Sequence, residues 1–111
     1  MEKLSIGQVV LATFPFSDLS SNKLRPCLII GIAEFNDVVL CQITSKRYQS
    51  ERAIPLLQTD FSTGSIVTDS FIRPDKIATL DKDMVKQILG GISDNKLDEV
   101  KQNLKIFLEI R

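Results

Sequence analysis

The sequence predicts a mainly β domain with one C-terminal helix, an α+β class in which short strands form a small barrel or sandwich. Runs rich in Val, Ile, Leu and Phe, punctuated by Gly, Pro and Asn, fill the first two thirds of the chain. Apolar residues recur at helical spacing near the C-terminus. Because 111 residues suffice for one core, we expect residues 1–111 to form a single domain.

The first expected strand is Gly7–Phe14, a β-rich run that a glycine opens. Turn-forming residues interrupt it at Pro15 and continue to Leu24. The resulting loop of about ten residues is long for a compact domain, and long loops often carry function.

The next two strands are expected to form a hairpin. Cys27–Ile32 is entirely apolar, which indicates a strand that is buried on both faces. Asn36-Asp37 predicts a turn, and Val38–Thr44 is the expected partner strand. If the two strands pair, their outer ends lie side by side. Arg25 would then be a neighbour of Thr44, close to the long loop.

Three more strands are expected in the middle of the chain. Ala53–Leu57 is short, and Pro55 favours an edge position because proline cannot donate to a sheet ladder. Ser65–Ile72 is dominated by β-branched residues. Arg73–Asp75 is expected to turn the chain, and Lys76–Leu80 to form a final strand.

The last third predicts helix. Asp81 is a suitable N-cap for a short helical turn, and Gly90-Gly91 separates this turn from the last element. Ser93 is a good N-cap for a helix that runs to about Glu109. Its apolar stripe consists of Leu97, Val100, Leu104 and Phe107. Such a helix would close one end of the barrel or support a dimer.

Composition excludes several classes of protein. The chain has no histidine, which rules out Ser-His-Asp and Cys-His catalysts and His-pair ribonucleases. Lys plus Arg and Asp plus Glu number 14 each, so a large duplex-DNA footprint is not expected. Cys27 and Cys41 lie in apolar runs and are expected to be buried thiols. We therefore expect no metal site and no cofactor.

The expected location is the cytoplasm, with no membrane association. Met1–Ser5 lacks the hydrophobic stretch of a signal peptide. The longest apolar runs, such as Cys27–Ala33, are too short to span a bilayer.

Several segments, in their order and spacing, resemble the MazF/PemK family of toxins. In the first half they are Gly7–Val10, Phe14–Phe16, Arg25–Ile30 and Gln42–Ser45. In the second half they are Ser65–Asp69, Thr79–Lys82 and a final helix that Ser93-Asp94 opens. The likeness runs from about Gly7 to Phe107. It implies an SH3-like barrel, a homodimer, sequence-selective cleavage of single-stranded RNA, and a cognate antitoxin peptide that fills the RNA groove.

The resemblance implies that Arg25 and Thr44 are catalytic. In metal-independent cleavage the neighbouring 2′-OH attacks phosphorus, which leaves a 2′,3′-cyclic phosphate and a 5′-OH. The enzyme aligns the 2′-OH and stabilises charge on the phosphoryl oxygens. The planar guanidinium of Arg25 suits those oxygens, and Thr44 offers a hydroxyl donor.

Further residues are candidates for RNA contact or support. Ser45 follows Thr44 and either supports the same phosphate or is a bystander. The neighbouring basic stretch contains Lys46 and Arg47; it either tracks the RNA backbone or is a solvated loop. The remaining candidates are Ser20, Lys23 and Asp69.

Two positions depart from the family pattern and keep an alternative function open. Many members have glutamate five residues before Arg25, where this chain has Ser20. A basic residue often precedes the acidic residue that matches Asp69, where this chain has Val67. The alternative is a non-catalytic module that binds RNA, an antitoxin-like peptide or another protein, as the related gyrase-poisoning toxins do. A third hypothesis is a structural subunit whose helix serves dimer packing.

Overall fold

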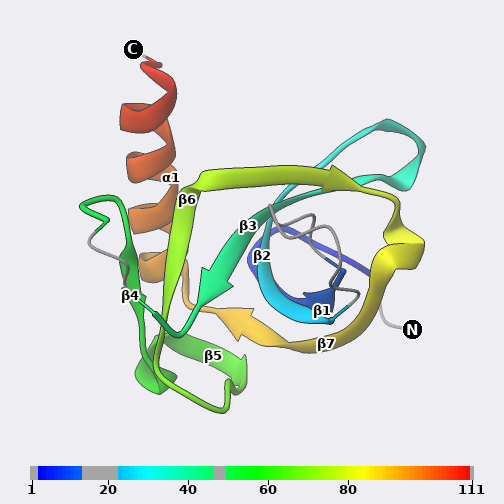
Figure 1. Ribbon diagram of the computed structural model, residues 1–111, viewed down its shortest axis with the longest axis horizontal. Helices are drawn as coiled ribbons and strands as arrows, with labels where there is room; N and C mark the ends of the chain where they lie inside the picture. The colour runs from blue at the N-terminus through cyan, green and yellow to red at the C-terminus, as the bar shows by residue number, and fades with distance from the viewer. Residues whose placement is uncertain (1–2, 14–22, 47–49, 111) are drawn as a thin grey trace.

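Seven strands form one curled antiparallel sheet in the residues that the computed structural model describes, 3–13, 23–46 and 50–110. The elements are β1 (Gln8–Ala12), β2 (Arg25–Ile32), β3 (Val38–Thr44), β4 (Ile54–Leu56), β5 (Phe61–Gly64), β6 (Ser70–Leu80), β7 (Val85–Ile92) and α1 (Asp94–Leu108). The strand order is β4-β6-β3-β2-β1-β7-β5. Figure 1 shows this sheet curling into a half-barrel with α1 at one side. The predicted class, mainly β with a C-terminal helix, is confirmed.

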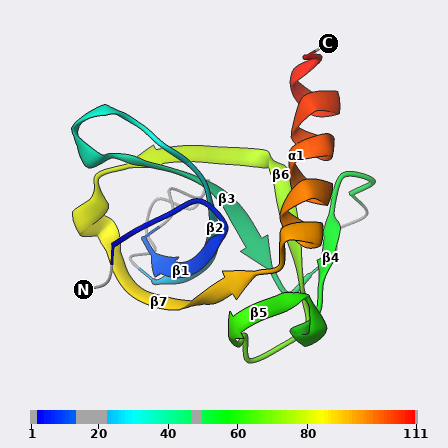
Figure 2. The same cartoon turned by 180° about the vertical axis from the view of Figure 1, so that it is seen from behind.

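Two apolar clusters pack against opposite faces of the sheet, because successive strand residues point to alternate sides. The inner cluster lies within the curl and contains Val10, Ala12, Cys27, Ile29, Val38, Leu40 and Val85. The outer cluster contains Val9, Leu28, Cys41, Ile43, Ile54, Leu56, Ile72, Ile92 and Val100. Val100 comes from α1, and Figure 2 shows this helix alongside β6 and β4. The helix therefore covers a face of the sheet and does not close an end.

The central hairpin forms as expected. β2 pairs antiparallel with β3, with Cys27 opposite Gln42 and Leu28 opposite Cys41. The turn between them is a single 3₁₀ turn, η1 (Glu34–Asn36). Burial of β2 on both faces is confined to its middle residues, since Ile32 is 47% exposed.

Two expectations about residues 65–80 are wrong. Residues 65–69 are not in a strand. The backbone amide of Ile66 donates a hydrogen bond to the side-chain Oε1 atom of Gln58 at 3.2 Å, and not to the backbone of a neighbouring strand. Arg73–Asp75 does not turn the chain but lies within the single strand β6. The β3–β6 register shifts at this point. A bulge tolerates Pro74 because the bulged residues leave the ladder.

Two strands were not expected at all. β5 is short and polar, and β7 contains the Gly90-Gly91 pair that the sequence analysis read as a break. The glycines are needed because β5 and β7 cross at very close range. A Cβ atom added to Gly64 would lie 2.0 Å from the Leu89 carbonyl oxygen, and one added to Gly90 would lie 2.3 Å from the Thr63 carbonyl oxygen. Gly64 also has a φ of +71°, which favours glycine.

Three further expectations are confirmed: the edge strand β4 and the caps at Asp81 and Ser93. β4 lies at the sheet edge, with Pro55 at its centre. Asp81 caps the 3₁₀ turn η3 (Lys82–Met84), and the Ser93 side chain accepts a hydrogen bond from the Lys96 amide at the start of α1. No helix in residues 3–13, 23–46 or 50–110 is long and apolar enough to cross a membrane.

Lys96 is not a solvent-facing residue of the helix. Its side chain is only 12% exposed, and its Nζ atom lies 3.6 Å from the Asp60 carboxylate and 2.8 Å from the Glu99 carboxylate. It also donates to the Pro55 carbonyl oxygen at 3.0 Å. One ammonium group therefore links α1 to β4 and to the 3₁₀ turn η2 (Gln58–Asp60).

The β5–β7 crossing predicts a strong position dependence for glycine substitutions. Gly64→Ala should lower the free energy of unfolding by about 1–3 kcal/mol, because the new methyl group meets backbone atoms. Gly31→Ala is the matched control, since its Cβ would meet only the Val39 side chain at 3.5 Å, an ordinary contact. Urea unfolding measures both. Equal losses for the two variants would contradict the close crossing.

Candidate functional site

A groove of about 550 Å³ opens where β2 begins and β3 ends. Arg25, Thr44, Ser45 and Lys46 all line it. The structure therefore brings together both predicted catalytic residues and two of the predicted supporting residues.

The strand register explains why Arg25 meets Thr44. β2 and β3 pair with Cys27 opposite Gln42, and the same register continued by two residues places Arg25 opposite Thr44. Opposite residues of an antiparallel pair point to the same face, with Cβ atoms about 4.5–5.5 Å apart. Phe71 of β6 pairs with Thr44 on its other side, so the row continues across three strands.

Local hydrogen bonds hold the two residues. The Thr44 Oγ1 atom accepts a hydrogen bond from the Lys46 amide at 3.2 Å. Because a hydroxyl group has one proton and two lone pairs, this bond leaves the proton available for donation. On the other strand, the Cys27 thiol donates to the Arg25 carbonyl oxygen at 3.4 Å. The thiol stays protonated because burial raises the pKa of Cys27 to about 12, with a smaller contribution from Cys41.

The opposite wall of the groove comes from a segment far away in the sequence. Ser65, Ile66, Val67 and Thr68 line the groove, and Ile66 also packs against the outer cluster. The Ser65 amide donates to the Leu89 carbonyl oxygen at 3.2 Å. The β5–β7 crossing therefore positions this wall. The sequence analysis expected residues 65–72 to form a strand, so it did not predict that residues 65–68 line the groove.

The groove is locally cationic, although the whole chain has a formal net charge of zero. Arg25 and Lys46 carry its positive charges, and none of the described residues that line it is a carboxylate. The described lining thus has a positive charge that the balanced composition of the whole chain does not reveal.

Gln42 is a groove residue to which the sequence analysis gave no role. It is only 6% exposed, and its Oε1 atom is buried without a hydrogen-bond partner. Buried polar atoms normally have a partner, so this oxygen can accept a donor from a bound molecule or water. The sequence offered one indication of a role for Gln42, because it is a polar residue within the otherwise apolar run of β3.

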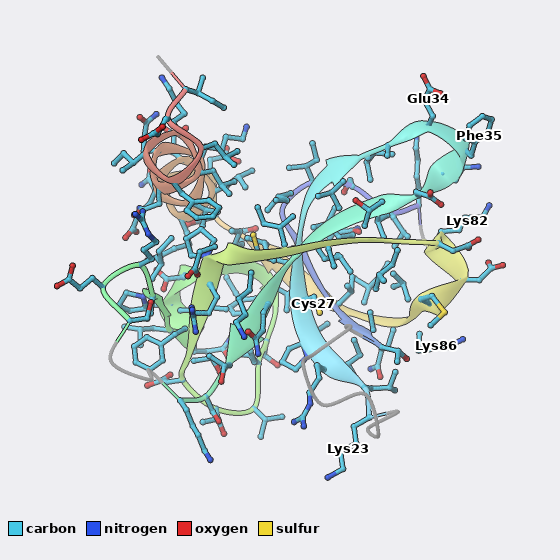
Figure 3. The ribbon with its side chains drawn as sticks, turned by 45° about the horizontal axis from the view of Figure 1, so that its top comes forward. Lys23, Cys27, Glu34, Phe35, Lys82 and Lys86 are labelled. Carbon is cyan, nitrogen blue, oxygen red and sulfur yellow. The ribbon has the colours of Figure 1, made fainter. Side chains whose placement is uncertain are left out.

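The other predicted site residues lie elsewhere. Asp69 is exposed, between Thr68 and Ser70, which line the groove. Lys23 is exposed and precedes β2; Figure 3 shows it at the lower edge of the molecule. Ser20 and Arg47 lie outside the described residues.

The carboxylate of Asp75 on β6 forms a salt bridge with Arg73. Arg73, which pairs with Gln42 across the sheet, donates two hydrogen bonds of 3.0 Å to Asp75. The bond from Arg73 lowers the pKa of Asp75, and the charge of Arg52 adds to this effect. Asp75 is therefore ionised at neutral pH and paired with Arg73, and it is not among the residues that line the groove.

A family profile matches the chain over most of its length. The profile describes the PemK-like, MazF-like toxins of type II toxin–antitoxin systems, and it matches residues 5–108. The chain belongs to this toxin family. No curated protein matches it by sequence.

Solved structures of MazF toxins have the same fold as this family member. A mycobacterial endoribonuclease in complex with its cognate antitoxin is 19% identical, with a TM-score of 0.76 and 98% of each chain covered. MazF from Deinococcus radiodurans is also 19% identical, with a TM-score of 0.75 and coverage of 96% and 97%. The Mycobacterium tuberculosis toxin MazF-mt6 is 14% identical, with a TM-score of 0.72 and coverage of 94% and 98%.

The buried thiols predict a loss of stability in alkali. Burial raises the pKa of both Cys27 and Cys41 from 9.0 to about 12. Above pH 9 the unfolded thiols lose their protons while the folded thiols keep them, so rising pH favours unfolding. Each thiol should lower the free energy of unfolding by about 1.4 kcal/mol per pH unit.

Urea unfolding between pH 8 and pH 10.5 measures this slope. The double variant Cys27→Ala/Cys41→Ala is the control, and its slope should be smaller, whatever its absolute stability. Identical slopes for the two proteins would show that the thiols titrate normally in the folded state.

Proposed function

We propose that this toxin is a metal-independent endoribonuclease that cleaves single-stranded RNA in the cytoplasm with sequence selectivity. The observation that carries the proposal is the groove in which an arginine and a threonine from paired strands lie together. Family membership and the endoribonuclease named among the structural neighbours support it.

In the proposed reaction the 2′-oxygen attacks the adjacent phosphorus, and the bond from phosphorus to the 5′-oxygen breaks. The 2′-oxygen loses its proton to solvent water, and the departing 5′-oxygen gains a proton from solvent water, so the step has no net gain or loss of protons. Arg25 donates hydrogen bonds to the phosphoryl oxygens, on which negative charge develops, and the Thr44 hydroxyl donates a hydrogen bond to the same oxygens. Ser45 and Lys46 line the same groove and would contact the RNA backbone on either side of this phosphate. We assign no side chain as the base.

The proposed partners follow from the family. Structural neighbours include an endoribonuclease bound to its cognate antitoxin and a MazE–MazF complex. We propose that this chain likewise forms a homodimer and that an antitoxin peptide occupies the RNA groove. The cationic lining suits an acidic peptide as well as a phosphodiester, so bound antitoxin would exclude RNA.

Arg25→Ala should lower the rate of RNA cleavage roughly 30- to 900-fold, which is a loss of about 2–4 kcal/mol of transition-state stabilisation. The assay uses a mixed-sequence single-stranded RNA in the presence of EDTA, with detection of cyclic-phosphate ends. Lys101→Ala, on the exposed face of α1, is the matched loss of one positive charge and should leave the rate unchanged. Cleavage that needs a divalent metal, or that survives Arg25→Ala, would refute the mechanism.

Thr44 should act through its hydroxyl group and not through its methyl group. Thr44→Ser keeps the donor and should retain most of the activity. Thr44→Val keeps the shape but removes the donor, and its rate should fall roughly 10- to 150-fold, the value of a hydrogen bond to a charged group. Single-turnover cleavage rates of the two variants give the comparison. Similar rates for both would remove Thr44 from the chemistry.

A second candidate function is a binding module that does not cleave. It is favoured by the absence of a carboxylate from the described lining of the groove. Saturable RNA binding by the purified protein, abolished by Arg25→Ala but without cyclic-phosphate products, would establish this function in place of the nuclease.

A further inference from the structure

A second concave site lies beside the tip of the β2–β3 hairpin. Its volume is about 600 Å³, and it shares no described lining residue with the groove of Arg25 and Thr44. Its floor is aliphatic and consists of Leu4, Ile32, Val38 and Val85. We call it the hairpin pocket.

Lysines surround the aliphatic floor. Lys3, Lys82 and Lys86 line the hairpin pocket, against one described carboxylate, that of Asp83. The Lys86 ammonium donates to the Asp83 backbone carbonyl at 2.8 Å, so this cation is held in place without being neutralised by that oxygen. The rim therefore has an excess of positive charge in a protein whose formal net charge is zero.

An exposed aromatic residue stands next to the pocket. Phe35 is 91% exposed and has a φ of 61°, a left-handed conformation that is unfavourable for a bulky side chain. Its neighbour Asn36, which lines the pocket, has a φ of 64°. Figure 3 shows Phe35, Lys82 and Lys86 along one side of the molecule, with Glu34 pointing outward at the tip.

The fold itself gives no reason for a phenyl ring at this position. Glycine or asparagine would form the same turn without strain, and the ring buries almost no surface against the rest of the chain. Strained and exposed residues of this kind gather at binding sites. Phe35 therefore points, independently of the pocket, to a ligand at the hairpin tip.

We propose that the hairpin pocket binds an acidic peptide segment of a partner protein, with one large apolar side chain inserted between the lysines. Charge complementarity selects the acidic flanks, and the aliphatic floor selects the apolar side chain. A nucleic acid fits less well, because the polar edges of an inserted base would find no partner on an aliphatic floor. Since the two sites share no described lining residue, this proposal does not depend on RNA cleavage.

The test is a titration of ¹⁵N-labelled protein with the capped peptide Glu-Asp-Glu-Phe-Glu-Asp-Glu, followed through backbone amide chemical shifts. Saturable shifts should appear at the amides of Ile32, Asn36, Val85 and Lys86, while those of Arg25 and Thr44 stay unchanged. A peptide with serine in place of phenylalanine and one with Gln and Asn in place of Glu and Asp should both bind more weakly.

Variants locate the binding energy. The double change Lys82→Gln/Lys86→Gln should weaken peptide binding at least about fivefold, as expected for two partly exposed charges. Lys101→Gln and Lys105→Gln on α1 together remove the same charge and should have no effect. Phe35→Asn should weaken binding several-fold while raising Tm, because asparagine suits the left-handed conformation.

Several results would overturn the proposal. They are shifts confined to the Arg25 groove, binding that is insensitive to Lys82→Gln/Lys86→Gln, and a lower Tm for Phe35→Asn. Tighter binding of a single-stranded DNA oligomer at the same amides would assign the pocket to nucleic acid instead. Shifts that depend on protein concentration alone would assign it to a second copy of this chain.

Discussion

The structure depends above all on the register between β2 and β3. Both strands are buried on both faces in their middle, with Cys27 and Leu40 in the inner cluster and Leu28 and Cys41 in the outer one. A slip of one residue would turn every side chain of a strand to the opposite face of the sheet. Such a slip would disrupt the packing of both apolar clusters, so both stabilise the observed register. The same register brings the start of β2 beside the end of β3, where Arg25 and Thr44 line one groove. The geometry of the candidate site is thus a consequence of core packing, and the site needs no dedicated scaffold.

The second constraint is the close crossing of β5 and β7. Gly64 and Gly90 allow the two backbones to meet where any side chain would collide with a carbonyl group. This contact aims residues 65–68 at the ends of β2 and β3, and so completes the groove. Lys96 ties the same region to α1 through Asp60 and the Pro55 carbonyl oxygen. The wall of the groove that residues 65–68 form is therefore held by backbone packing and by the ammonium group of Lys96.

Charge is distributed unevenly over a chain whose totals balance. Arg25 and Lys46 lie in one concave site, and Lys82 and Lys86 lie in another, while many carboxylates lie elsewhere or are paired, as Asp75 is with Arg73. A small toxin can thus attract anionic ligands locally without the general basicity that would cause non-specific binding to nucleic acid. The two sites share no described lining residue, so the peptide proposed for the hairpin pocket would not compete with a ligand in the groove.

The sequence by itself determined the local features: the central hairpin, the edge position of β4, the Asp81 and Ser93 caps, the final helix and the meeting of Arg25 and Thr44 in one groove. Each of these follows from residue preferences and strand alternation over short distances. Tertiary structure alone decided the rest. Gly90-Gly91 is a strand because Gly64 approaches it from 26 residues away, and Arg73–Asp75 stays in β6 because a bulge absorbs Pro74. The orphaned oxygen of Gln42 and the hairpin pocket depend on contacts between distant segments, and such contacts have no periodic signal in the sequence.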